Sequence, residues 1–260
     1  MELLGRLISI SSFFLKFNIF FNFISININN YENSLKTIIP LYLKRIFYER
    51  ITEPIHLNLI SILVFLFGNF KLKVDFDLVL RHPYAYSILE AANRAKNLGK
   101  KKISIFEFGV ANGAGLINMQ NISKRVTKFT SIHIDIYGFD SGQGMPAPKS
   151  YKDHPELYQE GDFTMDIERL KSKLDSNTKL IIGDIKSTIH KFIKENNFED
   201  APISFLNIDV DYYSSTVDCL KILLVKPDEL LPTTIIYLDD LEDILHNSKC
   251  GEEAAILKFI

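Results

Sequence analysis

The sequence predicts an α/β fold in which a doubly wound, mostly parallel sheet carries helices on both faces. Two observations predict it. From about residue 80 onward, short apolar runs of strand length alternate with longer helical stretches. Turns rich in glycine and aspartate separate these runs. Because strands that alternate with helices pair in parallel, the sheet is expected to be covered on both faces.

The expected elements follow one another without internal repeats. A helix over 82–97 ends in a basic turn and leads into the first strand, and a glycine-containing turn then opens a helix that ends near Lys124. Strands are expected at 103–108, 131–139, 180–182, 203–208 and 233–238, with further helices near 165–174, 185–194 and 215–224. The domain division is a helical N-terminal extension, 1–80, and the main domain, 81–260.

The N-terminal extension is strongly apolar. Its first segment, 3–26, is interrupted by Arg6, Lys16 and two asparagines, and its second, 55–70, is short. A membrane span needs about 20 predominantly apolar residues, and a signal peptide needs a basic start and a small-residue cleavage site. Neither pattern is met, so helices packed on the main domain are expected, with weak membrane-surface contact through 1–70 as the alternative.

Charge and cysteine content exclude some classes of function. The net charge is −2, which gives no electrostatic case for binding nucleic acid. Cys219 and Cys250 have neither metal-ligand spacing nor a disulfide framework, so they are expected to be buried thiols in a reducing compartment. A cytoplasmic location follows, with peripheral membrane contact left open.

Carboxylates stand at the carboxyl end of every predicted strand. Ligands of open α/β sheets bind beyond these ends, so a succession of acids there favours one shared ligand site over separate helix caps. Two aspartates after the fourth strand are one residue apart and would repel each other unless a cation or donors lay between them. The acids are Glu107, Asp140, Asp184, Asp209, Asp211, Asp239 and Asp240.

The turn after the first strand contains Gly109, Gly113 and Gly115. Glycine permits a positive φ and lets a ligand approach the backbone closely. The spacing does not match the dinucleotide pattern G-x-G-x-x-G, and Glu107, just before the turn, would repel a phosphate. The turn therefore suits a ligand with a positively charged amino group better than a pyrophosphate.

Five stretches in this order, EFGVANGAG, YGFDSGQGMP, GD, NIDVDYYSST and YLDD, resemble those of class I S-adenosylmethionine-dependent methyltransferases, which have a Rossmann-like sheet. The likeness covers roughly 80–260 and is greatest to the macrocin O-methyltransferase type, with its similar FDS-x-x-G-x-P and ID-x-D-x-Y-x-x-T signatures. It implies an O-methyltransferase acting on a hydroxyl of a small molecule or sugar.

The resemblance also implies roles for the acids. Glu107 and the turn from Gly109 through Gly113 to Gly115 would hold the amino-acid end of S-adenosylmethionine. Asp140 would bind its ribose, and Asp184 would lie beside its adenine.

In metal-dependent members of the family, an acid ending strand four and a pair ending strand five bind magnesium. The matching residues here are Asp209, Asp239 and Asp240. Magnesium prefers oxygen ligands and lowers the pKa of a bound hydroxyl. The proton acceptor is open between Asp209 and Asp211, and His246 is a weaker candidate because it is expected in an exposed loop.

The long segment 141–162 contains three prolines and scattered charge, which suits a lid or substrate loop. Tyr158 and Phe163 could line an acceptor pocket. Tyr212 and Tyr213 could do so as well, or could pack over the next helix.

The chain stops at GEEAAILKFI, a predicted helix, so the last two strands of the family's sheet are expected to be lacking. The open edge that this leaves, together with the apolar N-terminus, favours a homo-oligomer. Three alternatives remain: a nucleotide-sugar glycosyltransferase with a metal at D-x-D 209–211, a nicotinamide-dependent oxidoreductase, and a catalytically silent relative. The acceptor is left open.

Overall fold

The computed structural model describes residues 55–241 and 248–260. The chain divides into two compact units, residues 1–63 and 64–260, and the second unit contains the described sheet. Phe70, Val74 and Val79 belong to the buried core of this second unit. His246 and the apolar segment 3–26 lie outside the described residues.

The sheet has five strands in the order β3-β2-β1-β4-β5, and every neighbouring pair is parallel. The predicted Rossmann-like α/β fold is thereby confirmed. From β1 the chain adds β2 and then β3 on one side of the sheet. It then crosses to the other side of β1, where it adds β4 and β5. The strand order therefore reverses between β1 and β4. The strands are β1 (Lys102–Phe108), β2 (His133–Asp140), β3 (Thr178–Ile182), β4 (Ile203–Ile208) and β5 (Leu230–Leu238).

Helices connect the strands as the alternating pattern predicts. The region predicted as one helix at 215–224 is instead an α-helix followed by a 3₁₀ helix, a common tightening at helix C-termini. The α-helices are α3 (Ile55–Phe67), α4 (Phe70–Asp75), α5 (His82–Asn97), α6 (Ala114–Thr130), α7 (Ile167–Lys171), α8 (Ile185–Glu195), α9 (Tyr213–Cys219) and α10 (Gly251–Phe259). The 3₁₀ helices are η1 (Tyr151–Asp153), η2 (Leu220–Leu224) and η3 (Pro227–Glu229).

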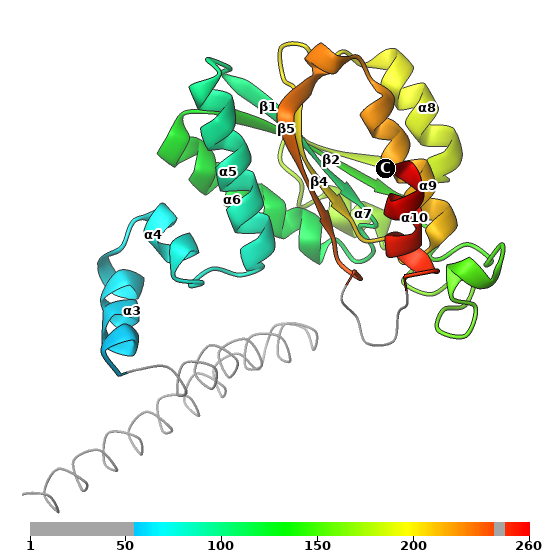
Figure 1. The fold of residues 1–260 in the computed structure, drawn as a ribbon, viewed down its shortest axis with the longest axis horizontal. Helices are drawn as coiled ribbons and strands as arrows, with labels where there is room; N and C mark the ends of the chain where they lie inside the picture. Colours follow the sequence, from blue (N-terminus) through cyan, green and yellow to red (C-terminus); the bar gives the residue numbers. More distant parts are fainter. Residues whose placement is uncertain (1–54, 242–247) are drawn as a thin grey trace, which may run out of the picture. The chain divides into compact units, whose positions relative to one another are not determined.

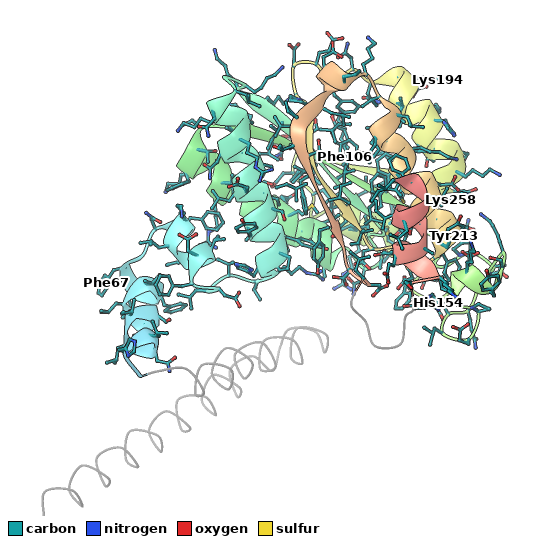
Figure 2. All side chains as sticks on the ribbon, viewed as in Figure 1. Phe67, Phe106, His154, Lys194, Tyr213 and Lys258 are labelled. Atoms are coloured by element: carbon teal, nitrogen blue, oxygen red, sulfur yellow. The ribbon has the colours of Figure 1, made fainter. Side chains whose placement is uncertain are left out.

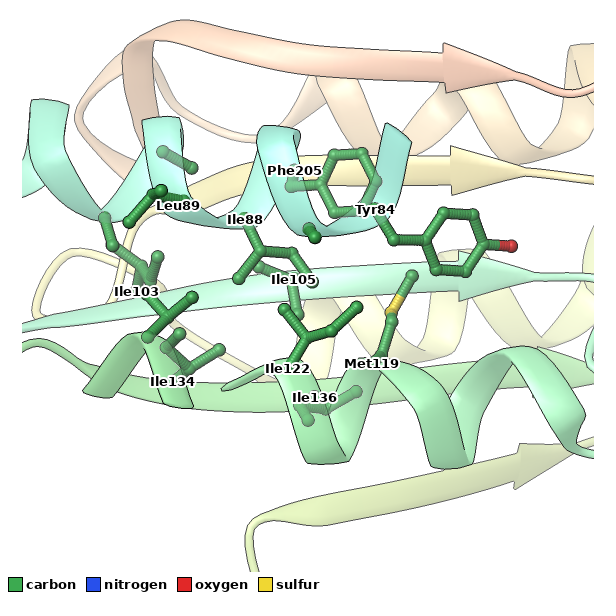
Figure 3. Packing of buried hydrophobic residues seen from close by; sticks show 14 of the residues in the cluster. Tyr84, Ile88, Leu89, Ile103, Ile105, Met119, Ile122, Ile134, Ile136 and Phe205 are labelled. Carbon is green, nitrogen blue, oxygen red and sulfur yellow. The ribbon is translucent and has the colours of Figure 1, made fainter. Parts of the chain in front are cut away.

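The sheet is the middle of three layers (Figure 1). Helices α5 and α6 cover one face, and α8, α9 and α10 lie over the other. Alternation along a strand sends neighbouring side chains to opposite faces. Ile103 and Ile105 of β1 therefore join the core under α5 and α6 (Figure 3), while Phe106 and Phe108 join the core under α8 and α9.

Helix α3 carries several exposed apolar side chains, and Phe67 at its end is 81% exposed. Figure 2 shows Phe67 at the margin of the described part, whereas Phe106 lies in its interior. Among the helices of residues 55–241 and 248–260, none combines the length and apolarity needed to cross a bilayer.

Candidate functional site

Asp140, the last residue of β2, joins two loops at the carboxyl edge of the sheet. Its Oδ2 accepts hydrogen bonds from the backbone N–H groups of Val110 at 2.9 Å and Ala111 at 2.8 Å. Its Oδ1 accepts a third from the N–H of Gly142 at 2.7 Å. A carboxylate offers about four acceptor positions, so Asp140 retains capacity for a ligand hydroxyl while it shapes the turn after β1.

Gly109 lies in direct contact with the end of β4. It has a φ of +86°, and a Cβ at this position would lie 1.7 Å from the carbonyl oxygen of Asp209. Any side chain would therefore separate the two strand ends. Gly113 also has a positive φ, +83°, and forms the N-cap of α6. The glycines thus allow the turn after β1 to lie close to its neighbours, as the sequence indicates.

A cavity of about 320 Å³ lies at this edge of the sheet, beside the point where the strand order reverses. Its size falls within the usual range for small-molecule sites, and the switch point is where open α/β sheets bind ligands. Five predicted site residues line it, and so do apolar side chains from β1, β2 and the following loops. The five are Gly109, Asp140, Asp184, Asp209 and Asp211.

The lining of this cavity is acidic. It contains four carboxylates, and no lysine, arginine or histidine is among the described residues that line it. Asp184, the N-cap of α8, already accepts a hydrogen bond from the N–H of Lys186 at 3.1 Å. The apolar part comes from Phe108, Phe139 and Phe163 among others. The cavity is therefore suited to a ligand that combines apolar surface with positive charge.

Asp209 is the most perturbed carboxylate of the lining. Burial raises its pKa to about 7, and the nearby charges of Asp239, Asp211 and Asp240 contribute to the rise. Asp211, two residues on, has a left-handed backbone with a φ of +57°. A carboxyl group with a pKa near neutrality can take up or release a proton at physiological pH, which is the property required of a general base.

Glu107 is not among the residues that line the cavity. Its side chain is buried at 2% exposure on the α5 side of the sheet, and its Oε1 accepts a hydrogen bond of 3.4 Å from the Tyr84 hydroxyl. That hydroxyl accepts one of 2.7 Å from Asn207 Nδ2, and Arg81 donates to it as well. Gly115 leaves room for the carboxylate, since a Cβ there would lie 1.9 Å from Glu107 Oε1.

Burial raises the pKa of Glu107 well above its ordinary value, and the nearby Arg81 only partly opposes this. Two buried acceptors of the group, Glu107 Oε2 and Asn207 Oδ1, have no hydrogen-bond partner among the described residues. Glu107 and Asn207 are register partners on neighbouring strands. Tyr84, Arg81 and Asn207 were not singled out from the sequence, because their proximity to Glu107 depends on how α5 packs on the sheet.

The acids that follow β5 have partners of their own. The Tyr237 hydroxyl donates to Asp239 Oδ1 at 2.8 Å. The N–H of Asp240 donates to Glu252 Oε2 at 3.3 Å. Asp239 and Asp240 do not line the cavity.

The structure gives no support to the magnesium site predicted at Asp209, Asp239 and Asp240. Within residues 55–241 and 248–260, no three His, Cys, Asp or Glu side chains are grouped so that they could hold a metal ion. The described arrangement therefore does not fit the ion.

The segment after β2 is anchored by a residue that the sequence did not reveal. Asp153 is fully buried, and its carboxylate accepts from the N–H of Lys149 and from the N–H of Ser214, each at 2.8 Å. This contact ties the segment to the start of α9. Phe163, directly after the predicted lid, lines the cavity, whereas Tyr212 is fully buried and packs edge-to-face against Tyr158.

Comparison with solved structures shows a likeness of fold. No family model and no curated protein matches the sequence. A solved structure described as CalS11, a calicheamicin methyltransferase, superposes with a TM-score of 0.52 over 80% of this chain and 84% of its own, at 20% sequence identity. At that identity the likeness establishes only that the chain shares the Rossmann-like fold of that protein.

Proposed function

We propose that the chain is a methyltransferase that binds S-adenosylmethionine in the cavity at the carboxyl edge of the sheet and methylates a hydroxyl of a small molecule or sugar. The observation that carries the proposal is the lining itself, which within residues 55–241 and 248–260 has four carboxylates and no basic side chain. A sulfonium cofactor with an ammonium group suits that lining, whereas the diphosphate of a nucleotide sugar or of a nicotinamide cofactor would be repelled. The fold likeness to a methyltransferase points the same way.

Within the proposal, the cofactor's amino-acid end is assigned to the glycine turn and Glu107, its ribose to Asp140 and its adenine to Asp184. The positions of Gly109, Asp140 and Asp184 around one cavity support this assignment. Glu107 is set back from the lining, so it would act through the turn that begins at Gly109. The buried Phe108 and Phe139 supply apolar surface.

When bound, the cofactor supplies an electrophilic methyl group on a positively charged sulfur. The proposed work of the chain is to accept the proton of the acceptor hydroxyl and to hold that oxygen in line with the methyl carbon. Asp209, with its pKa near 7, is the first candidate for the proton acceptor, and Asp211 is the second. Methyl transfer would form a bond between the acceptor oxygen and the methyl carbon and would break the carbon–sulfur bond, whose electron pair would remain on sulfur. Positioning supplies most of the acceleration in such a displacement.

Isothermal titration calorimetry of the full chain with S-adenosylmethionine, a UDP-sugar and NAD tests the proposal. Binding of S-adenosylmethionine alone is expected. Asp140→Ala should weaken it about tenfold or more, because the loop shaped by three hydrogen bonds to Asp140 would be released. Asp228→Asn, at an exposed position in η3, is the matched control and should leave the affinity unchanged. Binding of the UDP-sugar alone would favour the glycosyltransferase alternative and refute the proposal.

A further inference from the structure

The backbone hydrogen bonds that pair β4 with β1 and with β5 end at Asp209 and Asp239. The N–H of Asp209 donates to the carbonyl of Phe108 at 2.9 Å, and the N–H of Asp239 donates to the carbonyl of Ile208 at 3.3 Å. The next backbone N–H groups, one residue beyond each of these strand ends, are those of Val210 and Asp240. Both donate to a single carboxylate, that of Glu252, at 3.2 Å to Oε1 and 3.3 Å to Oε2. Glu252 thus continues the pairing of the two strand ends beyond the sheet.

Glu252 comes from a distant part of the chain and is firmly held. It lies in the first turn of α10, which packs against α9 beside the sheet (Figure 1), and it is 2% exposed. The ring of Tyr213 on α9 lies 5.9 Å from Lys258 Nζ of α10, and both residues appear in the same region in Figure 2. Gly251 lies so close to the carbonyl of Asp211 that a Cβ would approach it to 3.2 Å. The start of α10 is therefore fixed against the segment after β4.

A carboxylate is an expensive group to place there. Burial raises the pKa of Glu252 to about 8; the nearby charges of Asp240 and Asp209 add to the rise, and the hydrogen bonds from the two backbone N–H groups oppose it. A helix that only had to cover the sheet could present an apolar side chain at lower cost. The N-terminal position on α10 and the two backbone hydrogen bonds are what offset the cost. The carboxylate is thus explained by the two N–H groups that it binds.

We propose that Glu252 is a positioning residue that fixes the ends of β4 and β5 relative to each other and so sets the place of Asp209 and Asp211 in the cavity. The inference rests on the proposed function, because it assigns a role in that same site. Val210 lies between the two aspartates and itself lines the cavity. A displacement of its backbone would carry both carboxylates with it. Misplacement by about 1 Å can cost about 100-fold in an enzyme.

Glu252→Gln in the full chain is the decisive variant. Glutamine keeps the length and shape of glutamate but has only one acceptor oxygen, so its amide nitrogen would face one of the two N–H donors. Glu253→Gln is the matched control, since Glu253 lies in the same helical turn, is half-buried and undergoes the same change of side chain. Two readouts are needed: hydrogen exchange of the Val210 and Asp240 amides, and S-adenosylmethionine affinity by calorimetry.

In Glu252→Gln, exchange of at least one of the two amides is expected to accelerate about tenfold or more, because a hydrogen bond to a carboxylate is lost. S-adenosylmethionine affinity is expected to fall by a similar factor of about ten, because the aspartates that line the cavity shift with Val210. Glu253→Gln should change neither quantity.

Two results would overturn the inference. The first is unchanged exchange of both amides. The second is a lower melting temperature with unchanged cofactor affinity, which would make Glu252 a purely structural residue. If the unaltered chain fails to bind S-adenosylmethionine, the proposed function fails by itself. In that case, unchanged exchange of the Val210 and Asp240 amides in Glu252→Gln would still refute the role of Glu252 in holding the two strand ends. Faster exchange in this variant would still support it.

Discussion

The face of the sheet under α5 and α6 is filled mostly by aliphatic side chains, whereas on the face under α8 and α9 a cluster of six aromatic rings packs among aliphatic side chains. On the first face the core runs up to a buried polar group, Tyr84, Glu107 and Asn207, at the carboxyl edge. Figure 3 shows the Tyr84 hydroxyl pointing toward the arrowhead ends of the strands. On the second face the rings of Phe108 and Phe139 reach the cavity and line it.

The difference between the faces shows how the position of a residue along a strand decides its role. Glu107 and Phe108 are neighbours at the end of β1, yet they point to opposite faces. Phe108 therefore lines the cavity, while Glu107 is buried with Tyr84 behind it. Because β1 is central and paired on both sides, this separation is fixed by the ladders on either side of it.

The largest expected effect comes from removing the ring at the centre of the aromatic face. Phe106 is fully buried and contacts the rings of five neighbours: Phe108, Tyr137, Phe139, Phe192 and Phe198. Phe106→Ala should destabilise the chain by about 3–5 kcal/mol through the cavity that it leaves. Urea unfolding followed by circular dichroism measures this. A loss below about 1 kcal/mol would mean that this face is not closely packed.

A smaller effect is expected at the polar edge of the aliphatic face. Gly115→Ala would place a methyl group on Glu107 Oε1 and should cost about 1–3 kcal/mol by overpacking. The double variant Gly115→Ala/Glu107→Ala removes the overlapping atom. A double-mutant cycle should therefore show that alanine at 115 is tolerated better when the carboxylate is gone. Additive losses would contradict the contact.

The smallest expected effect concerns how the free energy of unfolding depends on pH. Because burial raises the pKa of Glu107 above the value near 4.5 of the unfolded chain, the folded state holds the proton over a pH range in which the unfolded state has lost it. The contribution of Glu107 to the free energy of unfolding is therefore largest at low pH and declines as the pH rises through this range. Glu107→Gln, which cannot titrate, should show a shallower decline of unfolding free energy above pH 4.5.

Urea unfolding of both proteins at several pH values measures the difference. Glu253→Gln provides the control, since it removes a half-exposed glutamate from α10, away from the polar group around Tyr84. Parallel curves for Glu107→Gln and the unaltered chain would show that the folded protein does not retain the proton of Glu107. A steeper decline in the variant would contradict the sign of the argument.

Local patterns alone were enough to predict the sheet and much of the site. The alternation of strands and helices is a local property, so it fixed the fold class and the number of strands. Aspartates such as Asp140, Asp184 and Asp209 come directly after or at the end of apolar runs, and parallel strands bring those ends to one edge. Gly109 was predicted to let a ligand approach the backbone closely, whereas the structure places it against the carbonyl oxygen of Asp209 at the end of β4.

Tertiary structure decided which of these residues meet. Tyr84 reaches Glu107 only because α5 packs over β1 and β4, and Asp153 reaches Ser214 only because the segment after β2 folds back onto α9. Glu252 stands in a helix near the end of the chain, and no local pattern links it to Val210 or Asp240. Contacts between residues 12 to more than 100 positions apart depend on how the layers pack. The sequence by itself therefore determined the sheet and its edge of acids, and packing alone decided which acids face the cavity and which hold the backbone around it.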